Sequence, residues 1–297
     1  MAGGQERILR GRIKSVKATR KITKAMELIA ASQIARSQAR IAANRPYRLG
    51  MQRIIAEAAT GDPAAARKLL ATAENERAVA VVVICGDRGL SGAYNSSVLR
   101  AGERLVQSLR AEGKQVRLFA VGKKAAPYYR FRGFDVEDSF IGFTDKPTFA
   151  DARIVADAIA APFVANEVQR VMVVSTRFIS AGSQVVESMQ LLPLRVSEDA
   201  LPASTGGLKG YTEFEPEVEQ LLTELAPKAL ESEIFSALLE GAASFHTSQQ
   251  RAMAAATDNA DELARTLTRI MNRARQDSIT TEIMEIVGGA EALRSGK

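Results

Sequence analysis

Three evenly spaced glycines follow an apolar run in "VVVICGDRGLSGAYN", and this is the segment whose residue types could bind a ligand. A glycine-rich loop between a strand and a helix can hold a phosphate, because its backbone N–H groups point at the anion. The P-loop pattern needs a lysine and a hydroxyl after its last glycine, and GxGxxG needs its first two glycines two residues apart. Gly86, Gly89 and Gly92 are spaced three apart, and no lysine follows them directly. The spacing favours a tight strand-to-helix turn, with nucleotide binding as the open alternative.

The tip of this turn and the rarity of catalytic residue types both point away from an enzyme. Asp87 and Arg88 are expected to be exposed at the tip, where they could meet a partner. The chain has one cysteine, Cys85, and one histidine, His246, which leaves little material for a disulfide, a metal cluster or a Ser/His/Asp triad. We predict no catalytic, cofactor-binding or metal-binding residues.

The elements that hold the turn begin with a long N-terminal helix, predicted over residues 1–60. Ile22, Met26 and Ile29 recur at intervals of four and three, with Ala25 and Leu28 beside them. This spacing predicts a narrow apolar stripe like that of a coiled-coil strand. We expect Pro46 to kink or interrupt the helix, because proline cannot donate to the helical ladder.

Residues 77–200 change to a period typical of alternating strands and helices. Short β-branched apolar runs lie at 78–85, 116–122 and 170–175, helix-like stretches at 93–112, about 123–132 and 149–165, and a possible edge strand at 183–194. Strands that alternate with helices predict parallel βαβ units. The segment is therefore expected to be a compact Rossmann-like α/β domain, smaller than a full dinucleotide-binding fold.

A loop over 201–216 leads to a second long helix, predicted within 217–297. Pro227 suits a first-turn position, so the helix is expected to begin there and continue from Lys228 to about Val287. Such a helix would reach roughly 90 Å. Its apolar stripe comprises Leu263, Leu267, Ile270, Ala274, Ile279, Ile283, Ile286, Ala290 and Leu293. The predicted fold class is α/β, with a long antiparallel coiled coil of the N- and C-terminal helices and the Rossmann-like α/β domain inserted between them.

Positive charge is concentrated at the N-terminus. Residues 1–53 contain thirteen Lys or Arg against Glu6 and Glu27, a net +11, while the whole chain carries +6. Such a segment attracts nucleic acid, anionic lipid or an acidic protein surface. The less favoured alternative is the solvated face of a helix, and the charge alone does not choose a partner.

Four segments, in order along essentially the whole chain, resemble the gamma subunit of the F-type ATP synthase. They are "KITKAMELIAASQIARSQAR" (21–40), "DRGLSGAYN" (87–95), "SQVVESMQLLPL" (183–194) and "NRARQDSITTEIMEIVGGAEAL" (272–293). The resemblance implies a non-catalytic rotor shaft. Its terminal helices would stand inside a ring of three alpha and three beta subunits. Its α/β domain would meet the epsilon subunit and the membrane c ring.

The resemblance also implies which residues meet those partners. Contacts with the alpha and beta subunits are expected at Lys24, Met26, Arg275, Gln276, Thr280 and Glu282 of the helices and at Asp87, Arg88 and Ser91 of the glycine loop. Tyr211, Glu213 and Glu215 are candidates for contact with the epsilon subunit or the c ring. Packing between the two helices is the competing explanation for Met26.

The implied location is the cytoplasmic face of a bacterial cell membrane. The chain starts without an apolar signal segment, has no apolar window long enough to span a bilayer, and lacks the redox cysteine pair of the plastid relatives. We expect one copy per complex, no cofactor, no nucleic acid and no direct membrane insertion. The alternative is a basic coiled-coil scaffold or nucleic-acid-binding protein, although base-stacking aromatics and groove-reading motifs are missing.

Overall fold

A computed structural model describes residues 2–61, 75–194 and 214–295. The chain divides into two compact units. We call Met1–Ile29 with Gln250–Lys297 the helical unit, and Ala30–Gln249 the domain unit. Each is described by itself.

The domain unit contains a five-stranded sheet in the order β3-β2-β1-β4-β5. Its strands are β1 (Ala78–Ile84), β2 (Gln115–Val121), β3 (Asp138–Phe140), β4 (Arg170–Phe178) and β5 (Gln184–Leu192). The first four are mutually parallel, and β5 runs antiparallel to β4. All seven residues of the central strand β1 are buried, as expected for a strand that is covered on both faces. The predicted α/β class is confirmed.

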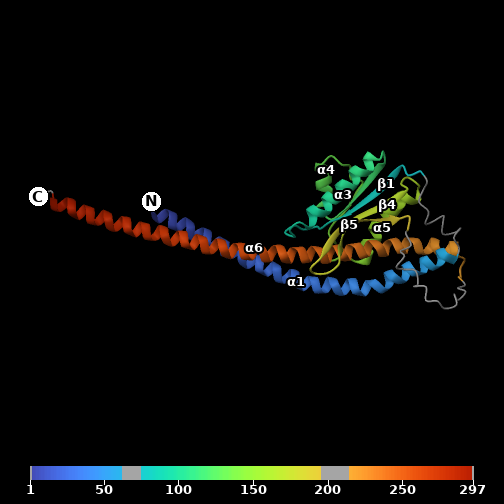
Figure 1. Ribbon diagram of the computed structural model, residues 1–297, viewed down its shortest axis with the longest axis horizontal. Helices are drawn as coiled ribbons and strands as arrows, with labels where there is room; N and C mark the ends of the chain where they lie inside the picture. The colour runs from blue at the N-terminus through green and yellow to red at the C-terminus, as the bar shows by residue number, and fades with distance from the viewer. Residues whose placement is uncertain (1, 62–74, 195–213, 296–297) are drawn as a thin grey trace. The chain divides into compact units, whose positions relative to one another are not determined.

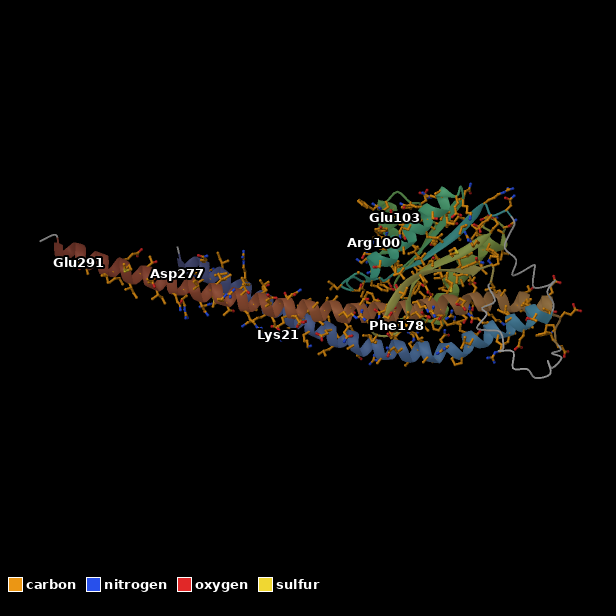
Figure 2. The ribbon with its side chains drawn as sticks, viewed as in Figure 1. Lys21, Arg100, Glu103, Phe178, Asp277 and Glu291 are labelled. Carbon is orange, nitrogen blue, oxygen red and sulfur yellow. The ribbon has the colours of Figure 1, made fainter. Side chains whose placement is uncertain are left out.

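Helices cover both faces of this sheet (Figure 1). On one face, α3 (Tyr94–Ala111) and α4 (Ala125–Phe131) pack on the odd-numbered residues of β1. Buried Glu103 of α3, labelled in Figure 2, ties these two helices together. Its carboxylate accepts hydrogen bonds from Tyr128 Oη (2.6 Å) and from the Arg132 guanidinium (2.7 Å) of the α4 region.

On the other face, α5 (Phe149–Val164) and part of α6 (Val218–Ser295) pack on the even-numbered residues of β1. Thr148 begins α5 with a reciprocal capping box to Asp151. Leu230, Ile234 and Leu238 of α6 belong to the same buried cluster as Val82. The sheet core is therefore completed by the C-terminal helix.

The two long helices, α1 (Ala2–Gly61) and α6, both contain a proline that does not end them. The expected interruption at Pro46 is wrong, because α1 continues through it. Pro46 is exposed, and Arg48 and Met51 hold the following turn against α6. The expected helix start at Pro227 is also wrong, since α6 begins at Val218. Leu222 of that extra segment is buried among residues that include Met51, so packing offsets the cost of an interior proline.

The packed face of α1 follows a heptad that apolar residues alone did not reveal, apart from the buried Ala56, which lies off it. In the helical unit its buried members are Leu9, Ile13 and Thr23. In the domain unit the buried members of the same heptad are Ala30, Ile34 and Ser37 and, two heptads further on, Met51, Ile55 and Ala58. Small and polar residues hold many of these positions, which keeps the apolar stripe narrow.

The predicted stripe of Ile22, Met26 and Ile29 is therefore wrong as a packing face. Ile22, Leu28 and Ile29 are 60–61% exposed, and Met26 is half-buried. On α6 of the helical unit, Met253, Thr257, Ala260 and Ala264 form the buried stripe, whereas Leu263 and Ile270 are exposed.

Candidate protein-interaction site

In the glycine loop after β1, polar groups form hydrogen bonds with one another. The Gly86 N–H donates to Asn95 Oδ1 (2.8 Å), and Asn95 Nδ2 donates to the Arg88 carbonyl (2.9 Å). Gly92 has a φ of 57°, as a tight turn into α3 requires. A Cβ at Gly86 would lie 3.1 Å from Cδ2 of Phe245 in α6, so an aromatic ring already covers the loop there. This geometry supports the turn and leaves no phosphate cradle at Gly86.

The carboxylate of Asp87 points into the domain, which corrects the expectation that it is exposed at the tip. Oδ1 accepts the N–H groups of Lys123 (2.9 Å) and Gly142 (3.0 Å), and Oδ2 accepts the N–H (3.0 Å) and hydroxyl (2.8 Å) of Thr144. Burial opposes ionisation, but these hydrogen bonds outweigh it and hold the pKa of Asp87 below its ordinary value. Asp87 therefore joins the loops that follow β1, β2 and β3.

We expect Asp87→Asn to lower the free energy of unfolding by about 1–2 kcal/mol at pH 7, because an amide cannot accept four hydrogen bonds at this half-exposed site. Since the folded pKa lies below the ordinary value of 3.8, the stabilisation is complete above that pH and is lost as the pH falls through the folded pKa. Denaturant unfolding from pH 7 to pH 3 checks this. The exposed Asp135→Asn is the matched control, and a deficit that stays constant with pH would contradict the assignment.

The rest of the loop tip is divided between buried and exposed side chains. Ser91 is only 2% exposed, and its Oγ accepts a hydrogen bond from Asn95. Arg88 is 76% exposed at its side chain and forms a 2.8 Å ion pair with Asp145. Leu90 is an exposed apolar residue with a φ of 61°. Arg88 and Leu90 are thus the side chains that this loop presents outward.

In the helical unit, α1 and α6 pair antiparallel through polar contacts. Thr23 Oγ1 and Thr257 Oγ1 are 2.8 Å apart and buried, and Arg20 forms a 2.5 Å ion pair with Asp261. Next to them, a shallow groove is lined by Lys17 and by the polar face of α6, including Arg269, Arg273 and Gln276. The Thr23–Thr257 and Arg20–Asp261 contacts set the register of the helix pair.

This register leaves the last part of α6 without a neighbouring helix in the helical unit. Thr23 lies opposite Thr257, so the start of α1 lies near residue 278 of α6, and α6 continues to Ser295 (Figure 1). Every residue from Thr280 to Glu291 is exposed, and Asp277 and Glu291 mark this segment in Figure 2. Four of the exposed residues are large and apolar: Ile283, Met284, Ile286 and Val287. Exposed apolar side chains on this scale are typical of a protein interface.

The structure separates the helix residues that the resemblance grouped together. Thr23 opposite Thr257 places Met26 beside Ala254, and the helical rise puts Glu282 about 40 Å further along α6. Met26 and Glu282 therefore lie in two different parts of the helical unit. Arg275, Gln276, Thr280 and Glu282 are all exposed, and Lys24 pairs with Glu27 at 2.9 Å.

Of the candidates for the epsilon subunit and the c ring, Tyr211 and Glu213 lie outside the described residues. Glu215 is exposed just before α6 begins. In the parts of the chain that the structure describes, no helix is long and apolar enough to cross a bilayer. The same residues contain no cluster of three or more His, Cys, Asp or Glu that could hold a metal ion.

Sequence reasoning missed a partly buried ionic cluster that joins α1 to α6 in the domain unit. Arg48 contacts Glu233 at 2.9 Å and Glu240 at 3.9 Å, and the Phe178 N–H donates to Glu240 Oε2 (3.1 Å). Burial raises the pKa of Glu240 above its ordinary value. The available signal was the heptad: Arg48 stands at a packed position of α1, where an unpaired charge would be costly.

Comparison with known proteins gives a single answer for the family. A family model described as "ATP synthase" matches residues 5–293. The chain is 48% identical over 297 residues to a protein named "ATP synthase gamma chain" from Parafrankia sp., with 99% of each chain covered. The chain belongs to the ATP synthase gamma-chain family. A gamma chain from Kineococcus radiotolerans is 47% identical, with 98% of each chain covered.

Solved structures carry the same fold as this gamma-chain family member. A chain from the Euglena gracilis mitochondrial ATP synthase, described as "OSCP/F1/c-ring, rotational state 3", matches with a TM-score of 0.67 and 19% identity over 99% of this chain and 96% of that chain. A second, from the rotor of the same organism's enzyme, matches with a TM-score of 0.64 and 18% identity over 93% of this chain and 99% of that chain. The predicted combination of terminal helices and an inserted α/β domain is thereby confirmed.

Proposed function

We propose that this gamma chain is the central rotor shaft of an F-type ATP synthase. In this role it couples proton flow through a membrane c ring to conformational change in catalytic beta subunits, and it carries out no chemistry itself. The observation that carries the proposal is the outer surface of the helical unit. There the buried stripe between α1 and α6 is narrow and partly made of small or polar residues, while Ile22, Leu28, Ile29 and the 280–291 segment leave large apolar side chains exposed. Such a pair needs surrounding protein.

This surface suits a shaft that turns inside a sleeve of three alpha and three beta subunits. A shaft must bind the sleeve differently at each angle, since only differential contact energy can shift the conformation of a partner. Apolar residues at several heights, together with the polar Arg275 and Gln276, offer different contacts to different subunits. The strongly basic first 53 residues favour acidic surfaces on those subunits.

The family and the solved structures with the same fold support the remaining partners. Structures with the same fold are described as the "central stalk/cring" of a Tetrahymena enzyme and as the Euglena "OSCP/F1/c-ring" assembly. We infer that one copy of this chain joins the complex at the cytoplasmic face of a bacterial membrane. Arg88 and Leu90 face the catalytic subunits, and the region of Glu215 faces the epsilon subunit or the c ring.

Met26→Lys is expected to impair coupling more than assembly. Met26 is half-buried and lies among exposed apolar residues, so a cation there must be desolvated against the sleeve. In inverted vesicles that carry the reassembled enzyme, we expect proton pumping per ATP hydrolysed to fall to less than about half. Met26→Leu should pump normally, and Ala18→Lys tests whether any added cation has the same effect. Normal coupling in Met26→Lys would remove this residue from the interface.

Reconstitution tests the function as a whole. The full chain, mixed with separately purified alpha and beta subunits, is expected to yield one stable ATPase with three copies of each partner and one of this chain, measured by native mass spectrometry. The basic N-terminus also fits a nucleic-acid-binding scaffold, and salt-dependent binding to arbitrary DNA with no assembly would favour that alternative. Assembly without DNA binding supports the rotor.

A further inference from the structure

In a doubly wound sheet, the position outside the carboxyl ends of the strands where the strand order reverses is where ligands bind. Here the order reverses at β1, because β2 lies on one side of it and β4 on the other. The glycine loop follows β1, and Phe178 ends β4. In this chain that position is taken by a segment of the chain itself, residues 240–246 of α6, which we call the docking segment.

The first contact of the docking segment is an aromatic ring on the glycine loop. Phe245 is 2% exposed and meets Tyr94, the first residue of α3, edge to face at 5.6 Å between ring centroids. A Cβ on Gly86 would lie 3.1 Å from Cδ2 of Phe245, which is closer than nine in ten real Cβ contacts. Glycine at position 86 therefore lets the ring lie directly on the loop.

The second contact is a glycine within α6 itself. Glycine is unfavourable inside a helix, so its presence at position 241 calls for a packing reason. A Cβ on Gly241 would lie 3.2 Å from the Tyr94 hydroxyl and 3.8 Å from Ile84 of β1. The absence of a side chain at Gly241 allows the helix to approach the carboxyl end of β1 closely.

Polar contacts are made at both ends of the docking segment. Glu240 accepts the backbone N–H of Phe178 at the end of β4 (3.1 Å), and His246 Nε2 lies 3.2 Å from the carbonyl of Asp145. Asp145 in turn pairs with Arg88 of the glycine loop. The docking segment thus contacts the end of β4, the loop after β1 and the loop after β3 within a few residues.

We infer that the docking segment is the junction through which torque passes between the α/β domain and the paired helices of the shaft. Rotation of the domain about α6 would have to drag Phe245 across Gly86 and Tyr94 across Gly241, so the two parts interlock rather than slide. Arg48 of α1 contacts Glu233 and Glu240 of α6, so both helices are held at the junction. This inference rests on the proposed rotor function.

The test compares rotation that drives proton pumping, in the complete enzyme reassembled with each variant, with rotation that drives none, in the ATPase portion detached from the membrane. We measure ATP-driven proton uptake per ATP hydrolysed in inverted vesicles, and hydrolysis by the ATPase portion detached from the membrane. Phe245→Ala is expected to lower the pumping ratio at least about threefold, because it removes a large buried ring from the junction. Hydrolysis by the detached portion should stay within about twofold, since no load then crosses the junction. A merely structural role would not separate the two rates.

Gly241→Ala and its repair provide a gentler pair of variants. Alanine favours the helix, so thermal stability of the shaft should not fall, yet its Cβ pushes Tyr94 away. We expect about a twofold lower pumping ratio for Gly241→Ala, restored in Gly241→Ala with Tyr94→Phe, which removes the hydroxyl in contact. Gly50→Ala of α1, whose Cβ would meet nothing within 4 Å, is the control.

The outcomes separate the inference from the proposed function. A wild-type chain that assembles no pumping enzyme would refute the rotor function itself. A wild-type enzyme that pumps, with unchanged ratios in Phe245→Ala and Gly241→Ala, would overturn the inference and leave the function intact. If Phe245→Ala does not assemble, Gly241→Ala and its repair decide: a loss that Tyr94→Phe restores supports the junction, and no loss overturns it.

Discussion

Gly122→Ala is expected to destabilise the domain unit by about 3–5 kcal/mol, among the largest effects of a single methyl group in this chain. Gly122 directly follows the last residue of β2 and has a φ of 95°. An added Cβ would lie 2.3 Å from the carbonyl oxygen of Cys85. That oxygen is backbone and cannot turn aside. The N–H of Gly122 also donates to the Phe140 carbonyl (2.7 Å), so displacement of Gly122 disturbs β3. Urea unfolding of the full chain, followed by the near-UV circular dichroism of its tyrosines, measures the loss.

Gly113→Ala is the matched control for this prediction. Gly113 also has a left-handed φ, 79°, but a Cβ there meets nothing within 4 Å. It should cost about 1–2 kcal/mol, the conformational penalty alone. Equal losses for the two variants would show that the contact with Cys85 carries no energy.

Arg48→Met is expected to destabilise the domain unit by about 2–3 kcal/mol. Arg48 is the cation shared by Glu233 and Glu240, and its removal leaves two mostly buried carboxylates without it. The value is set below that of a fully buried pair, because the Arg48 side chain is 29% exposed. Gln52 Nε2 still donates to Glu233 (2.6 Å), which limits the loss. The same unfolding experiment applies, followed by far-UV circular dichroism.

A double variant separates the contribution of the Arg48–Glu233 ion pair from that of the packing of the Arg48 aliphatic chain. Arg48→Met with Glu233→Leu replaces two charges by apolar groups of similar size and should recover most of the stability. Arg45→Met, an exposed arginine on the same helix, should change little. If the double variant loses the sum of the two single losses, the interaction between Arg48 and Glu233 contributes nothing.

The α/β domain could be predicted because its strands are short, continuous apolar runs. The run "AVAVVVI" of β1 is seven residues long, apolar throughout and rich in β-branched valine, and the helices between the strands show their own period. Strand β3 was missed because three residues, Asp138–Phe140, carry no recognisable pattern. Helix continuity through Pro46 and Pro227 was missed because packing across the helix pair is not visible in a local rule.

The packed face of the shaft was predicted wrongly for a physical reason. Apolar periodicity assumes that large apolar residues are buried within the chain, and in α1 the exposed Ile22, Leu28 and Ile29 break this assumption. Thr23 and Ser37 are buried in their place. A helix pair that is surrounded by other subunits places apolar residues on its outer surface. The failure of apolar periodicity to predict the buried face is therefore itself a sign of a partner.

The candidate site was predictable only in part. Arg88, Arg275 and Gln276 are exposed, as their predicted contacts require. Asp87 is turned inward by hydrogen bonds to distant loops, and Ser91 is buried beside Asn95. The contacts of Phe245 with Gly86, and of Gly241 with Tyr94, join residues far apart in the sequence. No local motif contains such pairs.

Rotation of the chain itself is the most direct test of the rotor function. Phe131 on α4 is 89% exposed, and Phe131→Cys offers an attachment point for a visible probe. Cys85 should not react, because it is fully buried and burial raises the pKa of its thiol to about 12. With the ATPase portion held on a surface by its beta subunits, ATP is predicted to drive continuous rotation of the probe in one direction. Sustained ATP hydrolysis with a stationary probe would contradict the account.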